Sequence, residues 1–202
     1  MDAEDAGDRS ALGWPVAVAN VMSRIHLTLS LRPEEKLHQI AAPAECDTAG
    51  GPAYSVDFRR TLGDLDVFAL WDGNEGNPAG IYQARLTAVV SPPRDLVATR
   101  GDDWVLQVDL STRREVTASG ALDLALTFTR LRGALFRDGS EFRPPRENPD
   151  LVVYQHRDGS PRGFAWRCTV VGDTDHESTV TDDVFVEAVT GEHLGTTRIS
   201  IS

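Results

Sequence analysis

The sequence predicts an all-β protein, an antiparallel β-barrel of about eight to ten strands with one or two short helices. Apolar and polar residues alternate along most of the chain, clusters of Gly, Pro, Asn and Asp separate the alternating segments, and helical periodicity is confined to short stretches. An antiparallel β-sandwich is the alternative, because both architectures bury one apolar face of each strand. We favour the barrel because closure removes the exposed edges of a sheet.

The alternation defines about ten segments in chain order. In the first of them, Ile25, Leu27, Leu29 and Leu31 are interleaved with polar residues. Such a segment has one apolar and one polar face, as a half-buried strand requires. The predicted strands cover residues 24–31, 54–58, 65–71, 82–90, 104–110, 122–128, 151–156, 164–171, 184–189 and 196–201.

Two clusters of turn-forming residues lie between strong strand patterns, at 72–78 and 158–161. Glycine and asparagine supply the positive φ angles that tight reversals need, so both clusters predict hairpins. Two longer segments, 41–53 and 137–150, show no periodicity and contain several prolines. We expect them to be loops.

Helical signals are confined to the N-terminal part of the chain. Residues 33–35, a proline and two glutamates, suit the first turn of a helix, because proline fits position N1 and acids favour the positive end of the helix dipole. Leu37 and Ile40 then share a face, and Pro43 ends this short helix. The sequence leaves undecided whether residues 14–24 form a second helix, since the β-branched residues of this segment equally favour extended structure.

The charge excludes several functions. The 202 residues include 31 acids and 20 lysines and arginines, giving a net charge of -11, so the field of the chain repels nucleic acids and anionic membranes. No apolar stretch is long enough to span a bilayer, and the acidic N-terminus lacks the positive region of a secretory signal. We expect a cytoplasmic protein with an acidic, disordered tail at 1–11 and a single β domain at 12–202.

Neither a metal site nor a cofactor is predicted. No two histidines stand at the sequence spacing of metal ligands. The sequence also contains no phosphate-binding loop, dinucleotide-binding motif or nucleophile motif. The acid-rich cluster of Asp173, Asp175, His176 and Glu177 has donors for a cation, but its composition favours a hydrated loop. Cys46 and Cys168 lie in unrelated settings, so we expect free thiols, with that of Cys168 buried and inert.

Aromatic residues supply the candidate ligand-binding side chains. Most of them fall on the apolar face of a predicted strand, which points into a barrel if the sheet closes. There they could line a cavity for an apolar guest, or they could fill the core. The candidates are Tyr54, Trp71, Tyr82, Trp104, Tyr154 and Trp166.

Two functional hypotheses follow. The first is a barrel that binds a small, apolar organic ligand, and whose chemistry, if it is an enzyme, is a cofactor-independent cyclisation or isomerisation that relies on proximity and a few polar groups. The second is a β-sandwich that acts as a protein-interaction or structural module, as a homo-oligomer. The first takes its support from the inward aromatics, and the second from the sheet edges that a sandwich leaves open.

Overall fold

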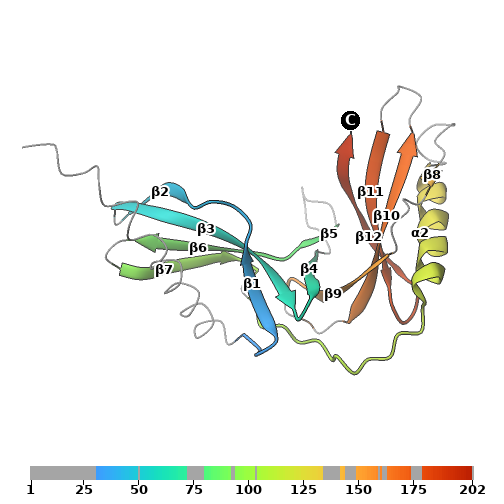
Figure 1. Cartoon of the computed structure of the whole chain (residues 1–202), viewed down its shortest axis with the longest axis horizontal. Coiled ribbons are helices and arrows are strands. Elements are labelled where there is room, and N and C mark those ends of the chain that lie inside the picture. The colour runs from blue at the N-terminus through green and yellow to red at the C-terminus, as the bar shows by residue number, and fades with distance from the viewer. Residues whose placement is uncertain are drawn as a thin grey trace, which may run out of the picture. The chain divides into compact units, whose positions relative to one another are not determined.

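The computed structural model is shown in Figure 1. It describes residues 31–49, 51–71, 80–91, 94–102, 104–133, 142–143, 149–158, 160, 163–173 and 179–201. The predicted tail at 1–11, the segment 14–24 and all but the last residue of the predicted strand 24–31 lie outside these residues.

The predicted all-β, barrel-type fold class is confirmed, because the described residues are mostly strand, with one helix among them. The elements are β1 (Glu35–Gln39), β2 (Ala44–Thr48), β3 (Gly51–Leu62), β4 (Leu65–Trp71), β5 (Gly80–Gln83), β6 (Arg85–Ser91), β7 (Arg94–Gly101), α2 (Ala118–Gly133), β8 (Phe142–Arg143), β9 (Asp150–His156), β10 (Phe164–Asp173), β11 (Thr179–Glu187) and β12 (His193–Ile201).

The hydrogen-bonded strand order is β12-β11-β10-β9-β4-β3-β6-β7, with β1 and β2 on β3, β5 on β4 and β8 on β10. The strand pairs whose register is described are antiparallel except for β4 with β9, which is parallel. The antiparallel pairs β4–β5 and β9–β10 flank the predicted turns 72–78 and 158–161, so both hairpins are confirmed.

The chain divides into two compact units. Unit 1 comprises residues 1–63 and 84–105, and unit 2 comprises 64–83 and 106–202. The prediction of one domain over 12–202 stays a prediction.

Unit 1 is built around the long strand β3. Its first half pairs with β2, its second half pairs with β1, and its other edge pairs with β6. The register places Val56 opposite Ala88 and Phe58 opposite Leu86, so these apolar side chains share one face of the sheet. This face forms the core of unit 1, into which β1 inserts Leu37.

In unit 2, the sheet curls until its two ends meet. Strands β5, β4, β9, β10, β11 and β12 follow one another in hydrogen-bonded order. The last strand then returns to the first, because the Thr197 hydroxyl donates to the Ile81 carbonyl at 2.6 Å. At Gly195 an added Cβ would lie 3.2 Å from the Ile81 side chain, so glycine permits this close approach. These six strands therefore curl in the manner of a barrel, with β12 and β5 approaching each other at this point, and we call them the unit 2 ring.

Helix α2 covers the outside of this ring. Its Ala121 and Ala125 pack against Cys168 and Val184, which lie on the outward face of β10 and β11. The Trp166 indole on the same face donates to the Val116 carbonyl at 2.9 Å, next to the start of the helix. Figure 1 shows α2 running alongside these strands.

The strand predicted at 122–128 is wrong, since these residues belong to α2. Leucine alternates there with Asp123, Ala125 and Thr127, a pattern that fits a strand, but leucine and alanine are also strong helix formers. The helix begins after Thr117, whose hydroxyl accepts a hydrogen bond from the Gly120 amide at 3.1 Å and so caps its N-terminus.

Further predictions also differ from the structure. The helix predicted from residue 33 is instead a turn followed by β1, because pairing with β3 outweighs weak helix signals. The predicted loop 41–53 contains β2 and the start of β3, and the predicted loop 137–150 contains β8. The strand predicted at 104–110 is mostly irregular, although Leu106 and Val108 are buried as its alternation requires.

Candidate functional site

The inward face of the unit 2 ring is apolar and aromatic. Phe68, Tyr154 and Phe185 come from β4, β9 and β11, and they pack with Ile81 and Val152. The Phe68 and Phe185 ring centroids lie 4.8 Å apart. The register explains this convergence, because Phe68 lies opposite Tyr154 in the parallel pair of β4 and β9.

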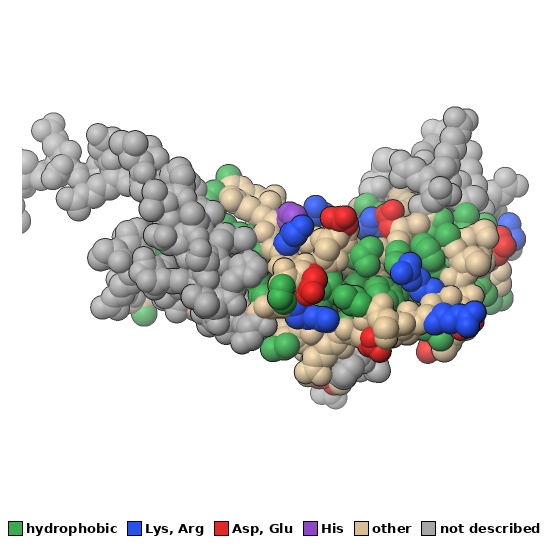
Figure 2. Space-filling model, turned by 60° about the horizontal axis from the view of Figure 1, so that its bottom comes forward, with side chains coloured by type: hydrophobic (Ala, Val, Ile, Leu, Met, Phe, Trp, Pro, Cys, Tyr) green, Lys and Arg blue, Asp and Glu red, His purple; other side chains and the backbone are tan. Residues whose placement is uncertain are grey.

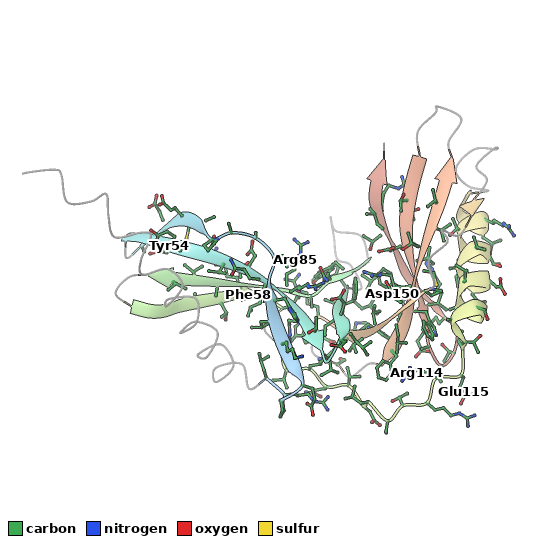
Figure 3. All side chains as sticks on the ribbon, viewed as in Figure 1. Tyr54, Phe58, Arg85, Arg114, Glu115 and Asp150 are labelled. Carbon is green, nitrogen blue, oxygen red and sulfur yellow. The ribbon has the colours of Figure 1, made fainter. Side chains whose placement is uncertain are left out.

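A charged cluster continues the same face towards one end of these strands. We call it the Arg167 cluster, and it consists of Asp66, Asp150, Arg167, Thr169 and Asp183. The register pairs Arg167 with Asp150 and with Phe185, so the guanidinium shares a face with the aromatic interior. Its central carbon lies 5.9 Å from the Phe68 ring. Figure 3 labels Asp150 at the start of β9.

Two short hydrogen bonds hold this cluster. Arg167 Nη2 donates to Asp150 Oδ2 at 2.5 Å, and the Thr169 hydroxyl donates to Asp183 Oδ1 at 2.7 Å. The Arg167 side chain is 27 % exposed and that of Asp150 is 60 % exposed, so the cluster is open to solvent on the Asp150 side.

The electrostatics of the cluster set Asp183 apart from an ordinary aspartate. Burial raises the pKa of Asp183, and the charges of Asp150 and Asp182 raise it further, while the Thr169 hydrogen bond and Arg167 act against them. Burial lowers the pKa of Arg167, but the hydrogen bond to Asp150 and three carboxylate charges outweigh it, so that pKa is raised overall. The cluster thus combines a fixed cation with a carboxyl that holds its proton to higher pH than usual.

These groups supply two chemical capabilities. A raised pKa brings the proton exchange of a carboxyl closer to neutral pH, which is the direction that general acid–base chemistry needs. A guanidinium beside an apolar surface can fix the orientation of a bound molecule through hydrogen bonds. The cluster therefore has the components of a small-molecule site.

The structure brings only one of the six predicted aromatic residues into this interior. Tyr154 lies there and is buried. Trp71, Tyr82 and Trp166 lie on the opposite, outward face of the ring, as their register with neighbouring strands shows. Tyr54 and Trp104 belong to unit 1. The role of all six aromatic residues in ligand binding stays a prediction.

The outward and unit 1 aromatics have other neighbours. Trp71 lies 5.1 Å beneath the Arg157 guanidinium, and Trp166 packs against α2. Tyr54 extends the core face of β3, where it lies opposite Val90 (Figure 3). The Trp104 ring stacks at 4.5 Å on the guanidinium of Arg60.

Arg60 is the centre of a second charged cluster, in unit 1. Its side chain and that of Glu35 are 1 % and 2 % exposed, and Arg60 Nη2 donates to Glu35 Oε2 at 2.6 Å. Arg60 Nη1 donates to the carbonyls of Asp102 and Trp104, each at 2.8 Å. Because both charges are buried and paired, this cluster is a structural clamp rather than an open site.

Sequence reasoning did not identify Arg167, Asp183 or Arg60 as site or clamp residues. The signal for Arg167 was a charged residue in a run that is apolar on both faces, from Phe164 to Val171. A strand that is buried on both sides excludes an unpaired arginine, so such a residue points to a partner or a site.

No group of three or more His, Cys, Asp or Glu side chains suited to a metal ion occurs in the described part of the chain. In the predicted loop of Asp173, Asp175, His176 and Glu177, Asp173 is the last residue of β10 and the other three lie outside the described residues. Cys46 and Cys168 are free thiols, as predicted.

The Cys168 thiol is inert at neutral pH, since burial raises its pKa to about 12 and the charge of Asp183 adds to the effect. An unfolded chain ionises this thiol from about pH 9, whereas the folded protein keeps it protonated. Its contribution to stability is therefore complete below pH 9 and is lost as the pH rises towards 12.

We expect Cys168→Ala to remove this alkaline sensitivity. Relative to the variant, the wild-type protein should lose on the order of 1.4 kcal/mol of unfolding free energy per pH unit above 9. Urea unfolding in a reductant between about pH 8 and pH 10 measures the difference, with Cys46→Ala as the matched control. A constant gap between wild type and Cys168→Ala over this range would contradict the prediction.

No family model matches this chain, and no curated protein matches it. Among the described residues, no helix is long and apolar enough to cross a membrane. On the face shown in Figure 2, basic and acidic side chains are interspersed. The predictions about nucleic acids, oligomeric state and cellular location stay predictions.

Proposed function

We propose that this chain binds a small, largely apolar organic molecule at the end of the unit 2 ring where the Arg167 cluster meets the aromatic interior. The observation that carries the proposal is the shared face of Phe68, Phe185 and Arg167, with the guanidinium 5.9 Å from the Phe68 ring. Apolar surface with a few fixed polar groups is the usual composition of a small-molecule site.

The interior also indicates where the molecule would bind. About eight strands are needed before a barrel interior can hold a ligand, and the unit 2 ring has six. Phe68 and Phe185 are already in contact there. The ligand therefore belongs beside the Phe68 ring at the charged end, with Arg167 and Asp183 around it.

Cofactor-independent isomerisation or cyclisation is the reaction class that these groups suit. Such reactions move a proton or close a ring within one molecule, so they need an acid–base group and a fixed orientation rather than an added reagent. Asp183 is the acid–base candidate because its carboxyl lies on the inner face, is held by the Thr169 hydroxyl, and has a raised pKa. Arg167 and the Thr169 hydroxyl would orient the substrate and the carboxyl.

A titration with 2-acetonaphthone, an apolar neutral probe, tests the proposal. We expect ¹⁵N-labelled protein to show saturable shifts in the backbone resonances of Phe68, Arg167 and Asp183. The indole N–H resonance of Trp166, which is bonded to Val116 on the outward face, should stay in place and is the internal control.

Two results would contradict the proposed site. One is the absence of saturable shifts up to the solubility limit of the probe. The other is a set of shifts confined to the indoles of Trp71, Trp104 and Trp166, which would place binding at the aromatics outside this interior. Asp183→Asn should keep most of the binding, since it preserves the size of the side chain.

A further inference from the structure

The charges and hydrogen-bond donors of the Arg167 cluster indicate which functional group the ligand carries. We infer that the ligand presents a neutral carbonyl, or a similar neutral hydrogen-bond acceptor, to Arg167, and that the site discriminates against carboxylates. This inference rests on the proposed function and specifies its substrate class.

The first step concerns the donors of Arg167. A guanidinium carries five N–H groups. One of them, on Nη2, donates to Asp150, and within the described residues the guanidinium makes no other hydrogen bond. The side chain is only 27 % exposed, so much of this donor capacity is withdrawn from water. Half-buried donors of this kind gain from an acceptor on a bound molecule.

The second step concerns the sign of the charge. Asp66 and Asp150 act on Arg167 with their negative charges, and Asp183 adds a third when it is ionised, so carboxylates outnumber the one cation. An incoming carboxylate would meet more repulsion than attraction. A neutral carbonyl accepts a hydrogen bond from Arg167 without adding a negative charge. The free donors of Arg167 require a hydrogen-bond acceptor, and the surrounding carboxylates repel a negative charge. Together they favour a neutral acceptor.

The third step concerns orientation. The guanidinium carbon lies 5.9 Å from the Phe68 ring, which is itself in contact with Phe185. A ligand whose acceptor bonds Arg167 can therefore place its apolar part against Phe68. The Asp183 carboxyl, the acid–base candidate, belongs to the same cluster, where the Thr169 hydroxyl donates to it at 2.7 Å.

Four naphthalene compounds that share one apolar body test the inference. They are 2-acetonaphthone, a ketone; 2-ethylnaphthalene, which lacks an acceptor; 2-naphthoate, an anion; and 2-naphthylmethylamine, a cation. Equilibrium dialysis against the full chain gives their dissociation constants. We expect the ketone to bind on the order of tenfold more tightly than the hydrocarbon, and the anion to bind most weakly.

Arg167→Met should abolish the preference for the ketone while retaining the binding of 2-ethylnaphthalene, because methionine keeps the apolar part of the side chain. Arg198→Met is the matched control. Arg198 pairs with Asp182 at 3.0 Å on the neighbouring strands and lies outside the Arg167 cluster. This variant should keep the preference of the wild-type protein.

The results separate the two proposals. If neither 2-ethylnaphthalene nor 2-acetonaphthone binds, the proposed function fails. If both bind equally well, or if the carboxylate or the amine binds most tightly, the proposed function stands and the inference is overturned. An unchanged ketone preference in Arg167→Met would also overturn it, because the acceptor would then bind elsewhere.

Discussion

Replacing Arg60 by methionine is expected to lower the free energy of unfolding by about 3–5 kcal/mol, because it leaves the buried Glu35 carboxylate without its partner. The same change removes the hydrogen bonds that Arg60 donates to the carbonyls of Asp102 and Trp104. Glu35→Gln should have a comparable effect from the other side of the pair. Urea unfolding of each variant measures the loss.

The double variant Arg60→Met/Glu35→Leu distinguishes an uncompensated charge from lost packing. If the uncompensated charge dominates, the double variant should be more stable than either single variant, because no buried charge is left. The exposed pair Arg113–Glu115 provides a control, and Arg113→Ala should change little. Near-wild-type stability in both Arg60→Met and Glu35→Gln would contradict the clamp.

Gly101→Ala is expected to destabilise the protein by about 2–5 kcal/mol, from backbone strain and a steric clash together. Gly101 has a φ of 100°, which residues with a side chain rarely adopt. An added Cβ would lie 2.5 Å from the Arg85 carbonyl oxygen, and the adjacent Asp102 is hydrogen-bonded to that same residue. The added Cβ is attached to the Gly101 backbone and the oxygen belongs to the Arg85 backbone, so neither atom can move aside without shifting a strand.

Gly63→Ala is the matched control for this change. Gly63 also has a positive φ, 59°, but its added Cβ would have no neighbour within 4 Å among the described residues. Its substitution should cost only the strain, on the order of 1–2 kcal/mol. Equal losses of unfolding free energy in the two alanine variants would show that the contact at Arg85 does not matter.

Strand positions were largely predictable from the alternation of apolar residues. The segments 54–58, 65–71, 151–156 and 164–171 all lie in strands. One-sided burial imposes a period of two on a strand, and that period is visible in a single sequence. The barrel-type class followed from the number of such segments and the hairpin turns between them.

The errors occurred where two periods fit the same residues. The leucines of α2 satisfy a strand pattern as well as a helix pattern, and the cap at Thr117 was the signal that could have separated them. Strands β1 and β2 are short, with few apolar residues, and both form by pairing with β3. Such pairing is a tertiary effect that no local window contains.

The candidate site depends on register rather than on any motif. Asp66, Asp150, Arg167 and Asp183 come from four different strands. The parallel pairing of β4 with β9 and the antiparallel pairings of β10 place them on one face. Alternation showed which residues of one strand share a face, but it could not show which strands are neighbours.

The aromatic prediction was limited by the same missing information. Trp71, Trp104 and Trp166 were each assigned to the apolar face of a strand. The unit 2 ring, however, has an apolar face on both sides, because α2 covers the outside. Trp166 lies on the covered outer face and Tyr154 on the inner one. A sheet that is buried on both faces cannot be oriented from hydrophobicity alone.

A crystal structure of the full chain grown with 2-acetonaphthone tests the proposed site most directly. We expect the naphthalene ring to lie against Phe68, and the ketone oxygen to lie within hydrogen-bond distance of the Arg167 guanidinium. A ligand bound against Trp71 or Trp104 instead, or an unoccupied Arg167 cluster in crystals whose protein binds the probe in solution, would contradict the proposal.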